Sequence, residues 1–462
     1  MDPDFDNQKW NLAAVFKPRS VLPIDEVHLE LYYPPAPIYR ESSEEYTIDV
    51  GRKRYLEALT EISKSGCVRE PSMADVLSII REIRERPFNV AALEDFSCTL
   101  DILVSKKTSD ITIIAQGSDG VVARGLLGDD FDIPEGAPPF VVKVALSEDD
   151  VSSMNEAVVG LYCTNKLRKL IPNFMYVYNF FNCNRPIISN TTISTCPLDT
   201  FDETIYTMVE TIADSDTFAT WITKHQNESD FMTRIHILIL QIVLSLSVAR
   251  DKFDFSHNDL HTGNVMIRKL PAPRTLVYRI KNSTYYVEVE EIATLIDFGR
   301  SHARIPIDEL PAVIQYSINK LPNYGVPGYA NFKEGKHINV GLMWAGIGIS
   351  PFRSETSYDI ARIVDTCALR IDNSINAREV FSWLRPLFRD EKIYETLRAY
   401  RSFWGGDPYY TNMPPSVDFL PQDLVRAVLP TLPEQVRERV SLSIRKPGMA
   451  PLFSCEEDVC AV

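Results

Sequence analysis

Regularly spaced apolar runs begin at about residue 108 of the chain. Short apolar runs bounded by turn residues are typical of strands. One stretch, 150–168, instead spaces its apolar residues as a helix does. The pattern therefore predicts a strand-rich unit with one helix, whose strands lie at 111–115, 121–127, 140–146, 175–181 and 205–211.

Beyond residue 216 the apolar period becomes helical. Residues 275–296 are an exception, because two strand-like runs flank Lys-Asn-Ser-Thr and predict a β-hairpin. Strands followed by helices indicate an α+β fold with two lobes, a small antiparallel β-rich N-terminal lobe and a larger helical C-terminal lobe. The predicted helices are 216–226, 231–251, 358–370, 376–388, 390–403 and 421–428.

These changes of pattern set the predicted domain boundaries. Residues 1–105 form an N-terminal extension of unknown role, with helical patterns at 51–64 and 73–86. The N-terminal lobe and its hinge, the C-terminal lobe, and a C-terminal extension with a tail are expected at 106–212, 213–404 and 405–462.

Composition narrows the classes of partner. The net charge of -15 argues against nucleic acid, because binding it relies on cationic side chains that neutralise phosphates. The longest apolar stretch, 237–249, is too short to span a bilayer, so we expect a buried core helix and no membrane span. The acidic N-terminus has no apolar signal segment, and the eight cysteines form no CxxC pair, which together favour reduced thiols and a cytoplasmic location.

A glycine turn and a buried lysine are the first residues with candidate chemistry. The turn at 117–120 separates two predicted strands, and glycine lets backbone N–H groups approach a phosphate, although a lone GxxG is more often an ordinary hairpin turn. Lys143 interrupts an apolar strand, where a charge is costly without a partner. Glu156 in the following helix is the expected partner, with the acidic residues 148–150 as competitors. Alternatively, Lys143 would face outward from a half-exposed strand, and Glu156 would lie on a solvated helix face.

The strongest signal is HNDLHTGN at 257–264, which fits H-x-D-x-x-x-x-N. On one tight loop, Asp259 can reach a substrate hydroxyl while Asn264 turns back to a metal ion. The alternative without catalytic function is a polar surface loop. Zinc binding by His257 and His261 is disfavoured, because the loop contains a glycine and lacks the glutamate of HExxH.

An apolar strand ends in Asp297, followed by phenylalanine and glycine. A carboxylate at this point can bind magnesium. Asp-Phe-Gly alone occurs often by chance. Its occurrence after the glycine turn, the strand lysine and the H-x-D-x-x-x-x-N loop, in that order, is typical of phosphoryl transfer.

GSDGVV, VVK, HNDLHTGN and IDFG together resemble the protein kinase superfamily over roughly residues 105–370. Within it, the pattern is similar to serine/threonine kinases encoded by large cytoplasmic DNA viruses such as the iridoviruses. The resemblance implies the two-lobed kinase fold, ATP with Mg²⁺ or Mn²⁺, and serine or threonine hydroxyls of proteins as acceptors. For a viral protein, the expected location is the host cytoplasm or the virion.

The resemblance also implies a role for each matched residue. Asp259 would be the catalytic base, and Glu156 would hold Lys143 over the phosphates. Asn264 and Asp297 would bind the metal ion. Backbone groups at Glu210 and Ile212 would bond adenine. The implied ATP-binding residues are Gly117, Ser118, Asp119, Gly120, Val122, Lys143, Glu210 and Ile212.

The sequence departs from the family at several positions. Ala115 replaces the first loop glycine, and Asn258 replaces the arginine that normally receives an activation-loop phosphate. His261 replaces a lysine, as in small-molecule phosphotransferases and some atypical protein kinases. Asp359 matches the helix aspartate that ties down the catalytic loop. A protein kinase, a small-molecule kinase and a pseudokinase scaffold therefore stay open, although a scaffold would not need all the catalytic residues that are present.

Overall fold

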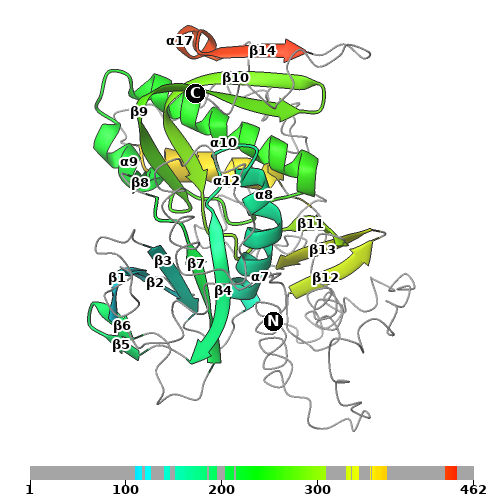
Figure 1. The fold of residues 1–462 in the computed structure, drawn as a ribbon. Coiled ribbons are helices and arrows are strands. Elements are labelled where there is room, and N and C mark those ends of the chain that lie inside the picture. Colours follow the sequence, from blue (N-terminus) through cyan, green and yellow to red (C-terminus); the bar gives the residue numbers. More distant parts are fainter. Residues whose placement is uncertain are drawn as a thin grey trace, which may run out of the picture. The chain divides into compact units, whose positions relative to one another are not determined.

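A computed structural model of the chain shows a mixed α+β fold built from antiparallel sheets (Figure 1). All of the described residues belong to the second of two compact units, Ile48–Val462. Outside them lie the predicted N-terminal extension, most of the C-terminal extension and the predicted helices 376–388, 390–403 and 421–428. The structure describes residues 110–116, 120–125, 140–145, 151–184, 187–194, 203–212, 215–307, 329–334, 336–342, 354, 356–371 and 432–444.

The strands predicted in the first region form one seven-stranded sheet with the order β4-β7-β3-β2-β1-β6-β5. Alternation along β2 sets its buried face, since Val121 and Ala123 are fully buried while Arg124 is exposed. Strands β5 and β6 were not predicted, because runs of three residues are too short to show a period. The strands are β1 (Asp110–Gln116), β2 (Gly120–Gly125), β3 (Phe140–Ala145), β4 (Val177–Asn184), β5 (Ile187–Ser189), β6 (Thr192–Ser194) and β7 (Glu203–Val209).

The helix predicted at 150–168 is confirmed as a continuous helical segment that contacts this sheet. It consists of α7 (Val151–Val159), a π-helical turn η2 (Gly160–Thr164) and α8 (Asn165–Arg168). The π-helical turn packs against β4. A Cβ atom on Gly160 would lie 2.5 Å from Val177 Cγ2, so a larger residue would push the helix off the strand.

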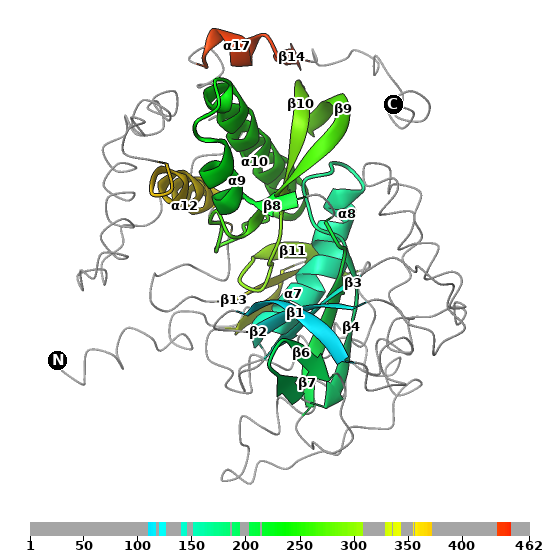
Figure 2. The same ribbon diagram turned by 90° about the vertical axis from the view of Figure 1, so that its left-hand side faces the viewer.

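Three helices of the second region match their predictions: α9 (Phe218–His225), α10 (Phe231–Phe253) and α12 (Thr356–Ala368). Thr217 caps α9 by accepting the Thr220 N–H. Within the described residues, α10 is the one helix long and apolar enough to cross a membrane, and 83% of that apolar stretch is buried inside the protein. Figures 1 and 2 show it alongside the β9–β10 hairpin, consistent with the predicted core helix.

Within its described residues, the second region contains more strand than the sequence predicted. Besides the hairpin of β9 (Val265–Ile280) and β10 (Ser283–Leu295), it has a three-stranded sheet of β11 (Ala303–Pro306), β12 (Tyr329–Glu334) and β13 (His337–Leu342). The hairpin is longer than predicted. Two prolines at 271 and 273 mask the first half of β9 in the sequence, and the pairing skips them because proline cannot donate to the ladder.

Two segments distant in sequence extend the hairpin into a four-stranded sheet of order β14-β10-β9-β8. Strand β8 (Ser215–Thr217) pairs with β9, and β14 (Val440–Ile444), preceded by α17 (Glu434–Arg437), pairs with β10. Part of the predicted C-terminal extension is therefore integrated into the fold.

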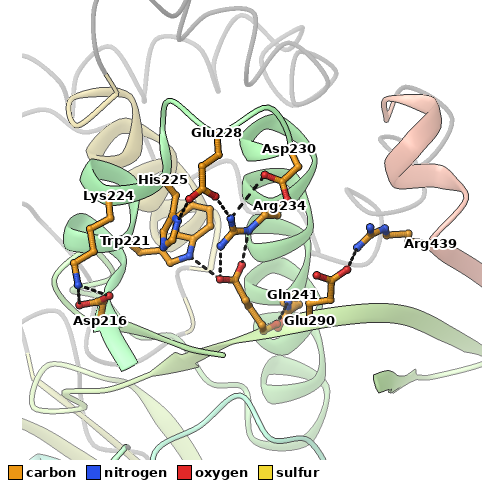
Figure 3. A network of polar contacts seen from close by, with 11 residues as sticks. Asp216, Trp221, Lys224, His225, Glu228, Asp230, Arg234, Gln241, Glu290 and Arg439 are labelled. Atoms are coloured by element: carbon orange, nitrogen blue, oxygen red, sulfur yellow. Dashed lines mark hydrogen bonds and ion pairs between the residues drawn. The ribbon is translucent and has the colours of Figure 1, made fainter. Parts of the chain in front are cut away.

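A polar network joins α9 and α10 to β10 (Figure 3). The Glu291 carboxylate accepts hydrogen bonds from Trp221 Nε1 at 2.9 Å and Arg234 Nε at 3.0 Å. The Arg234 guanidinium also lies 4.9 Å from the centroid of the Trp221 ring and pairs with Glu228. Because Glu291 and Trp221 are buried, these polar groups depend on one another for their hydrogen bonds.

We expect Glu291→Ala to lower the free energy of unfolding by about 2–3 kcal/mol, since it removes the acceptor of the buried Trp221 indole N–H and of the Arg234 Nε and Nη2 groups, while Arg234 keeps its pairing with Glu228. The matched control is Glu290→Ala. Its ion pair with Arg439 is exposed and should contribute less than about 1 kcal/mol. Urea unfolding of the two variants checks the difference, and equal losses would contradict a buried network centred on Glu291.

Candidate active site

Helix α12 anchors the start of the 256–264 loop through Asp359. The two carboxylate oxygens of Asp359 accept the backbone N–H groups of His257 and Asn258, each at 2.7 Å. Burial raises the pKa of Asp359 to about 8, whereas the two N–H groups and Arg362 favour the carboxylate. This is the contact expected of Asp359 from the sequence, because it ties the loop to a core helix.

The same face of α12 reaches the rest of the loop. Arg362 and Thr366 follow Asp359 by about one and two turns, so the three side chains line one side of the helix. Arg362 Nη2 lies 2.7 Å from Asp259 Oδ1. Thr366 Oγ1 accepts the backbone N–H of Thr262 at 3.2 Å. Helix α12 therefore positions both the backbone of the loop and the side chain of Asp259.

Lys143, Glu156 and Asp297 come from β3, α7 and the end of β10, and they meet at one ammonium group. Lys143 Nζ donates to Glu156 Oε1 at 2.8 Å and to Asp297 Oδ1 at 3.0 Å. Burial opposes the ammonium charge, but the two carboxylates outweigh it and raise the pKa of Lys143. The acidic residues 148–150, which competed with Glu156, lie outside the described residues.

Asp297 is held in an unusual backbone conformation that turns its carboxylate toward the ammonium. Its φ of 67° lies in the left-handed region, which is costly for a non-glycine residue. The next residue, Phe298, is fully buried, and its ring centroid lies 6.4 Å from those of Phe174 and Phe255. Desolvation opposes ionisation of Asp297, but Lys143 outweighs it and lowers the pKa of Asp297.

The hairpin keeps Asn264 beside Asp297 although many residues separate them in the sequence. Val265 and Leu295 are paired at the base of the hairpin, and the Ile296 N–H donates to the Asn264 carbonyl at 3.0 Å. An insertion shaped as a hairpin returns the chain to its starting point, so it leaves the site intact. Asn264 Nδ2 donates to the Asp259 carbonyl at 3.0 Å.

Two buried asparagines hold the backbone after Phe298. Asn155 Nδ2, from α7, lies 3.4, 3.1 and 2.8 Å from the carbonyl oxygens of residues 298, 299 and 301. Asn258 Nδ2 donates to the carbonyl of Arg300 at 3.1 Å. Asparagine amides thus bond four successive carbonyl groups, and Asn258 does so from the position where protein kinases usually have an arginine.

Part of the predicted nucleotide site lies within the described residues. Gly120 and Val122 belong to β2, whereas 117–119 lie outside the described residues. Val122 is paired with Lys143 across β2 and β3, and Lys143 with Thr207 of β7. Directly opposite residues share one face of a sheet, so Val122 lies next to Lys143 on the face that carries the ammonium.

At the predicted hinge, the Glu210 side chain points into the protein. It accepts the Tyr176 N–H at 3.0 Å, and its oxygens lie 3.6 and 3.5 Å from the guanidinium nitrogens of Arg168 and Arg268. A buried carboxylate needs such compensation. The Glu210 N–H donates to the Tyr176 carbonyl at 2.9 Å, so it serves the fold. The Glu210 N–H is therefore not available for the predicted backbone contact with adenine, and half-buried Ile212 lies two residues further on.

The two loop histidines make separate contacts. His257 Nε2 donates to the Ile296 carbonyl at 2.8 Å, and His261 Nδ1 accepts the Gly263 N–H at 3.0 Å. Burial lowers the pKa of each to about 4, so both rings are neutral at pH 7. Within the described residues, no group of three or more His, Cys, Asp or Glu side chains could hold a metal ion.

We expect His257 to make folding pH-dependent. Its pKa falls from 6.5 to about 4 on folding, so stability is fully present above pH 6.5 and is lost as the pH falls toward 4. The loss from this residue should approach about 3 kcal/mol. Urea unfolding of wild type and His257→Gln from pH 7.5 to 4 checks it. Identical pH dependence in the two proteins would contradict a buried, neutral imidazole.

Sequence reasoning missed Arg362, Thr366 and Asn155. Their partners lie far away in the sequence, so no local motif contains both members of a pair. The spacing of Arg362 from Asp359 was a usable signal, because two charged residues one turn apart share a helix face. An asparagine within an apolar helix was another, since it needs buried partners.

Comparison with known proteins gives distant similarities. No family model matches the chain. The chain is 26% identical to the uncharacterized protein 179R of Invertebrate iridescent virus 6, over 59% of this chain and 24% of that protein. It is 25% identical to the probable kinase 098L of Invertebrate iridescent virus 3, over 48% of this chain and 39% of that protein.

A third similarity, at 30% identity, is to a probable serine/threonine-protein kinase of Dictyostelium discoideum. It covers 19% of this chain and 8% of that protein. The chain thus spans less than half the length of each of these relatives. Taken with the geometry of the site, these similarities indicate a kinase-like protein related to proteins of iridoviruses.

Proposed function

We propose that the chain is an ATP-dependent phosphotransferase with the two-lobed protein-kinase fold, and that it transfers the γ-phosphate of ATP to serine or threonine hydroxyls of proteins. The observation that supports this most strongly is the meeting of Lys143 with both Glu156 and Asp297, at 2.8 and 3.0 Å. One ammonium group thereby joins strand, helix and the Asp-Phe-Gly segment, and a lysine–glutamate ion pair between strand and helix is required for phosphoryl transfer by protein kinases. In this proposal the seven-stranded sheet and α7 form the smaller lobe.

The transfer depends on positioning more than on covalent chemistry by the protein. The acceptor oxygen attacks the γ-phosphorus, the bond from that phosphorus to the β,γ-bridging oxygen breaks, and ADP leaves with the electron pair. Asp259 accepts the hydroxyl proton. Lys143, held by Glu156, offers its charge to the α- and β-phosphates.

Asn264 and Asp297 fit a magnesium or manganese ion. Both offer hard oxygen donors, which these ions prefer. Asn264 uses its amide nitrogen on the Asp259 carbonyl, and this leaves its amide oxygen for a cation. The Asp297 side chain is 43% exposed despite its contact with Lys143. A bound divalent ion would supply neutralisation of the negative charge on the β- and γ-phosphates.

The nucleotide is assigned to the face of the sheet that carries Lys143. Gly117, Ser118, Asp119 and Gly120 would cover the phosphates, with Val122 packing on adenine. The Glu210 carbonyl and the Ile212 N–H would bond the base. Support comes from the pairing of Val122 with Lys143, which places the two side chains next to each other on one face of the sheet.

A protein hydroxyl is favoured as the acceptor by the similarity to a probable serine/threonine-protein kinase. A small-molecule kinase is the second candidate, and His261 favours it because its ring bonds to its own loop in place of a lysine that would face the phosphate. The similarity to iridovirus proteins makes the host cytoplasm or the virion the proposed location.

The test is incubation with labelled ATP, Mg²⁺, a set of generic protein substrates and a panel of small alcohols, with Asp259→Asn as the inactive control. Label on serine or threonine of protein supports the proposal, and label on a small alcohol supports the second candidate. Equal label with wild type and Asp259→Asn, including none with either, would overturn the enzymatic proposal and favour a scaffold.

We also expect activity to be independent of phosphorylation of the chain. Asn155 and Asn258 hold the backbone after Phe298 with their own amides, so no phosphate is needed to order it. Enzyme treated with phosphatase should keep its activity within about twofold. A loss that reverses on incubation with ATP would contradict this expectation.

A further inference from the structure

We propose that Arg362 of α12 is the positioning residue for Asp259, and that it supplies there the positive charge that protein kinases take from a lysine two residues after the base. The inference rests on the proposed function, since it assigns Asp259 as the base. Its starting point is the ion pair of Arg362 Nη2 with Asp259 Oδ1 at 2.7 Å, formed between a buried guanidinium and a carboxylate that is 19% exposed.

The guanidinium is fixed in one orientation from its far side. Arg362 Nη1 donates to the Tyr358 hydroxyl at 2.6 Å, and the guanidinium carbon lies 5.9 Å from the centroid of the Tyr358 ring. Tyr358 lies one turn earlier on the same helix, so the pair is held within a rigid element. A planar guanidinium held in this way directs its remaining N–H groups with little loss of entropy.

The other basic groups of the site are committed elsewhere. Lys143 Nζ contacts Glu156 and Asp297. The His261 ring turns back on its own loop, where Nδ1 accepts the Gly263 N–H. Arg362 is thus a cation at the base in a loop that has lost the family lysine, and it arrives from a helix instead.

If α12 only had to hold the loop in place, the contacts of Asp359 and Thr366 on the same helix face would be sufficient. Asp359 already binds the loop backbone through two N–H groups, and Thr366 binds it again further along. Arg362, in contrast, contacts the side chain of Asp259, which is the group that must be aimed at the acceptor hydroxyl. Its removal should therefore change turnover more than it changes folding.

The first experiment compares Arg362→Gln, Arg362→Lys and Arg370→Gln. Arg370 lies just beyond α12 and is exposed, so its variant is the control for loss of one positive charge. We expect Arg362→Gln to lower kcat by about 10–100-fold with KM for ATP nearly unchanged, and lysine to restore part of the loss. Full activity of Arg362→Gln would overturn the inference, as would a loss confined to KM.

The second experiment asks whether Arg362 acts through Asp259. In the Asp259→Asn background, Arg362→Gln should cause no further loss of turnover, because the group that it positions is already gone. Losses that multiply would show a separate role and overturn the inference. Added guanidinium ion should raise the turnover of Arg362→Ala, and it should leave that of Arg370→Gln unchanged.

Melting temperatures of the wild type, Arg362→Gln, Asp259→Asn and the double variant separate this inference from the proposed function. The destabilisation by Arg362→Gln should be smaller in the Asp259→Asn background if the ion pair exists, whether or not the wild type transfers phosphate. Additive shifts in melting temperature would refute the pair itself. A coupled pair in a wild type that transfers no phosphate would refute the proposed function and, with it, the assignment of Arg362 to a catalytic base.

Discussion

Replacing Asp259 with asparagine should lower turnover by about 10²–10⁴-fold while leaving the KM for ATP within about threefold. The carboxylate accepts the proton of the acceptor hydroxyl in the proposed reaction, and an amide oxygen is a far weaker base. ATP binding should survive, because the hydrogen bonds of the Lys143 ammonium are with Glu156 and Asp297 and do not depend on Asp259. Steady-state kinetics with varied ATP check both numbers.

The matched control is Asp230→Asn. Asp230 is 60% exposed and precedes α10, away from the loop, so the same chemical change there should leave turnover unchanged. If Asp259→Asn kept more than about a tenth of the wild-type turnover, the assignment of the base would be wrong.

Replacing Asp297 with alanine should remove the dependence of nucleotide affinity on magnesium. In the wild type we expect Mg²⁺ to tighten ATP binding by at least about tenfold, because the Asp297 carboxylate and the Asn264 amide supply oxygen ligands to the ion. Without the carboxylate, Lys143 keeps Glu156 as its partner, so the ammonium can still attract phosphate. Calorimetric titrations with and without Mg²⁺ check the expectation.

The control for charge is Glu156→Gln, which removes the other carboxylate from Lys143 and leaves the proposed metal ligands in place. This variant should keep the magnesium effect while it weakens binding of the phosphates. Loss of the magnesium effect in Glu156→Gln, or its survival in Asp297→Ala, would place the ion elsewhere.

Local pattern was sufficient to predict most described elements. The helix at 150–168 and the helices α9, α10 and α12 have periods long enough to detect from the sequence. The first half of β9 was missed because Pro271 and Pro273 argue against a strand, whereas the structure bypasses them at an irregular pairing. Strand β14 was missed because its pairing with β10 joins segments far apart in the sequence.

The residues of the candidate site likewise fall into those that the sequence predicted and those that it did not. Motif spacing identified Lys143, Asp259 and Asp297, because each belongs to a short pattern whose chemistry explains its residues. Arg362 and Asn155 belong to no such pattern. Their roles arise from tertiary contacts with a carboxylate and with backbone carbonyls, which the sequence does not specify locally.

The proposed reaction requires one magnesium–nucleotide complex surrounded by four side chains, those of Lys143, Asp259, Asn264 and Asp297. A crystal structure of the protein with Mg²⁺ and a non-hydrolysable ATP analogue tests it directly. We expect Asn264 and Asp297 oxygens at about 2.0–2.1 Å from the ion, with Lys143 Nζ on the phosphates and Asp259 facing the γ-phosphate. An analogue bound away from these side chains, or an ion that neither Asn264 nor Asp297 touches, would contradict it.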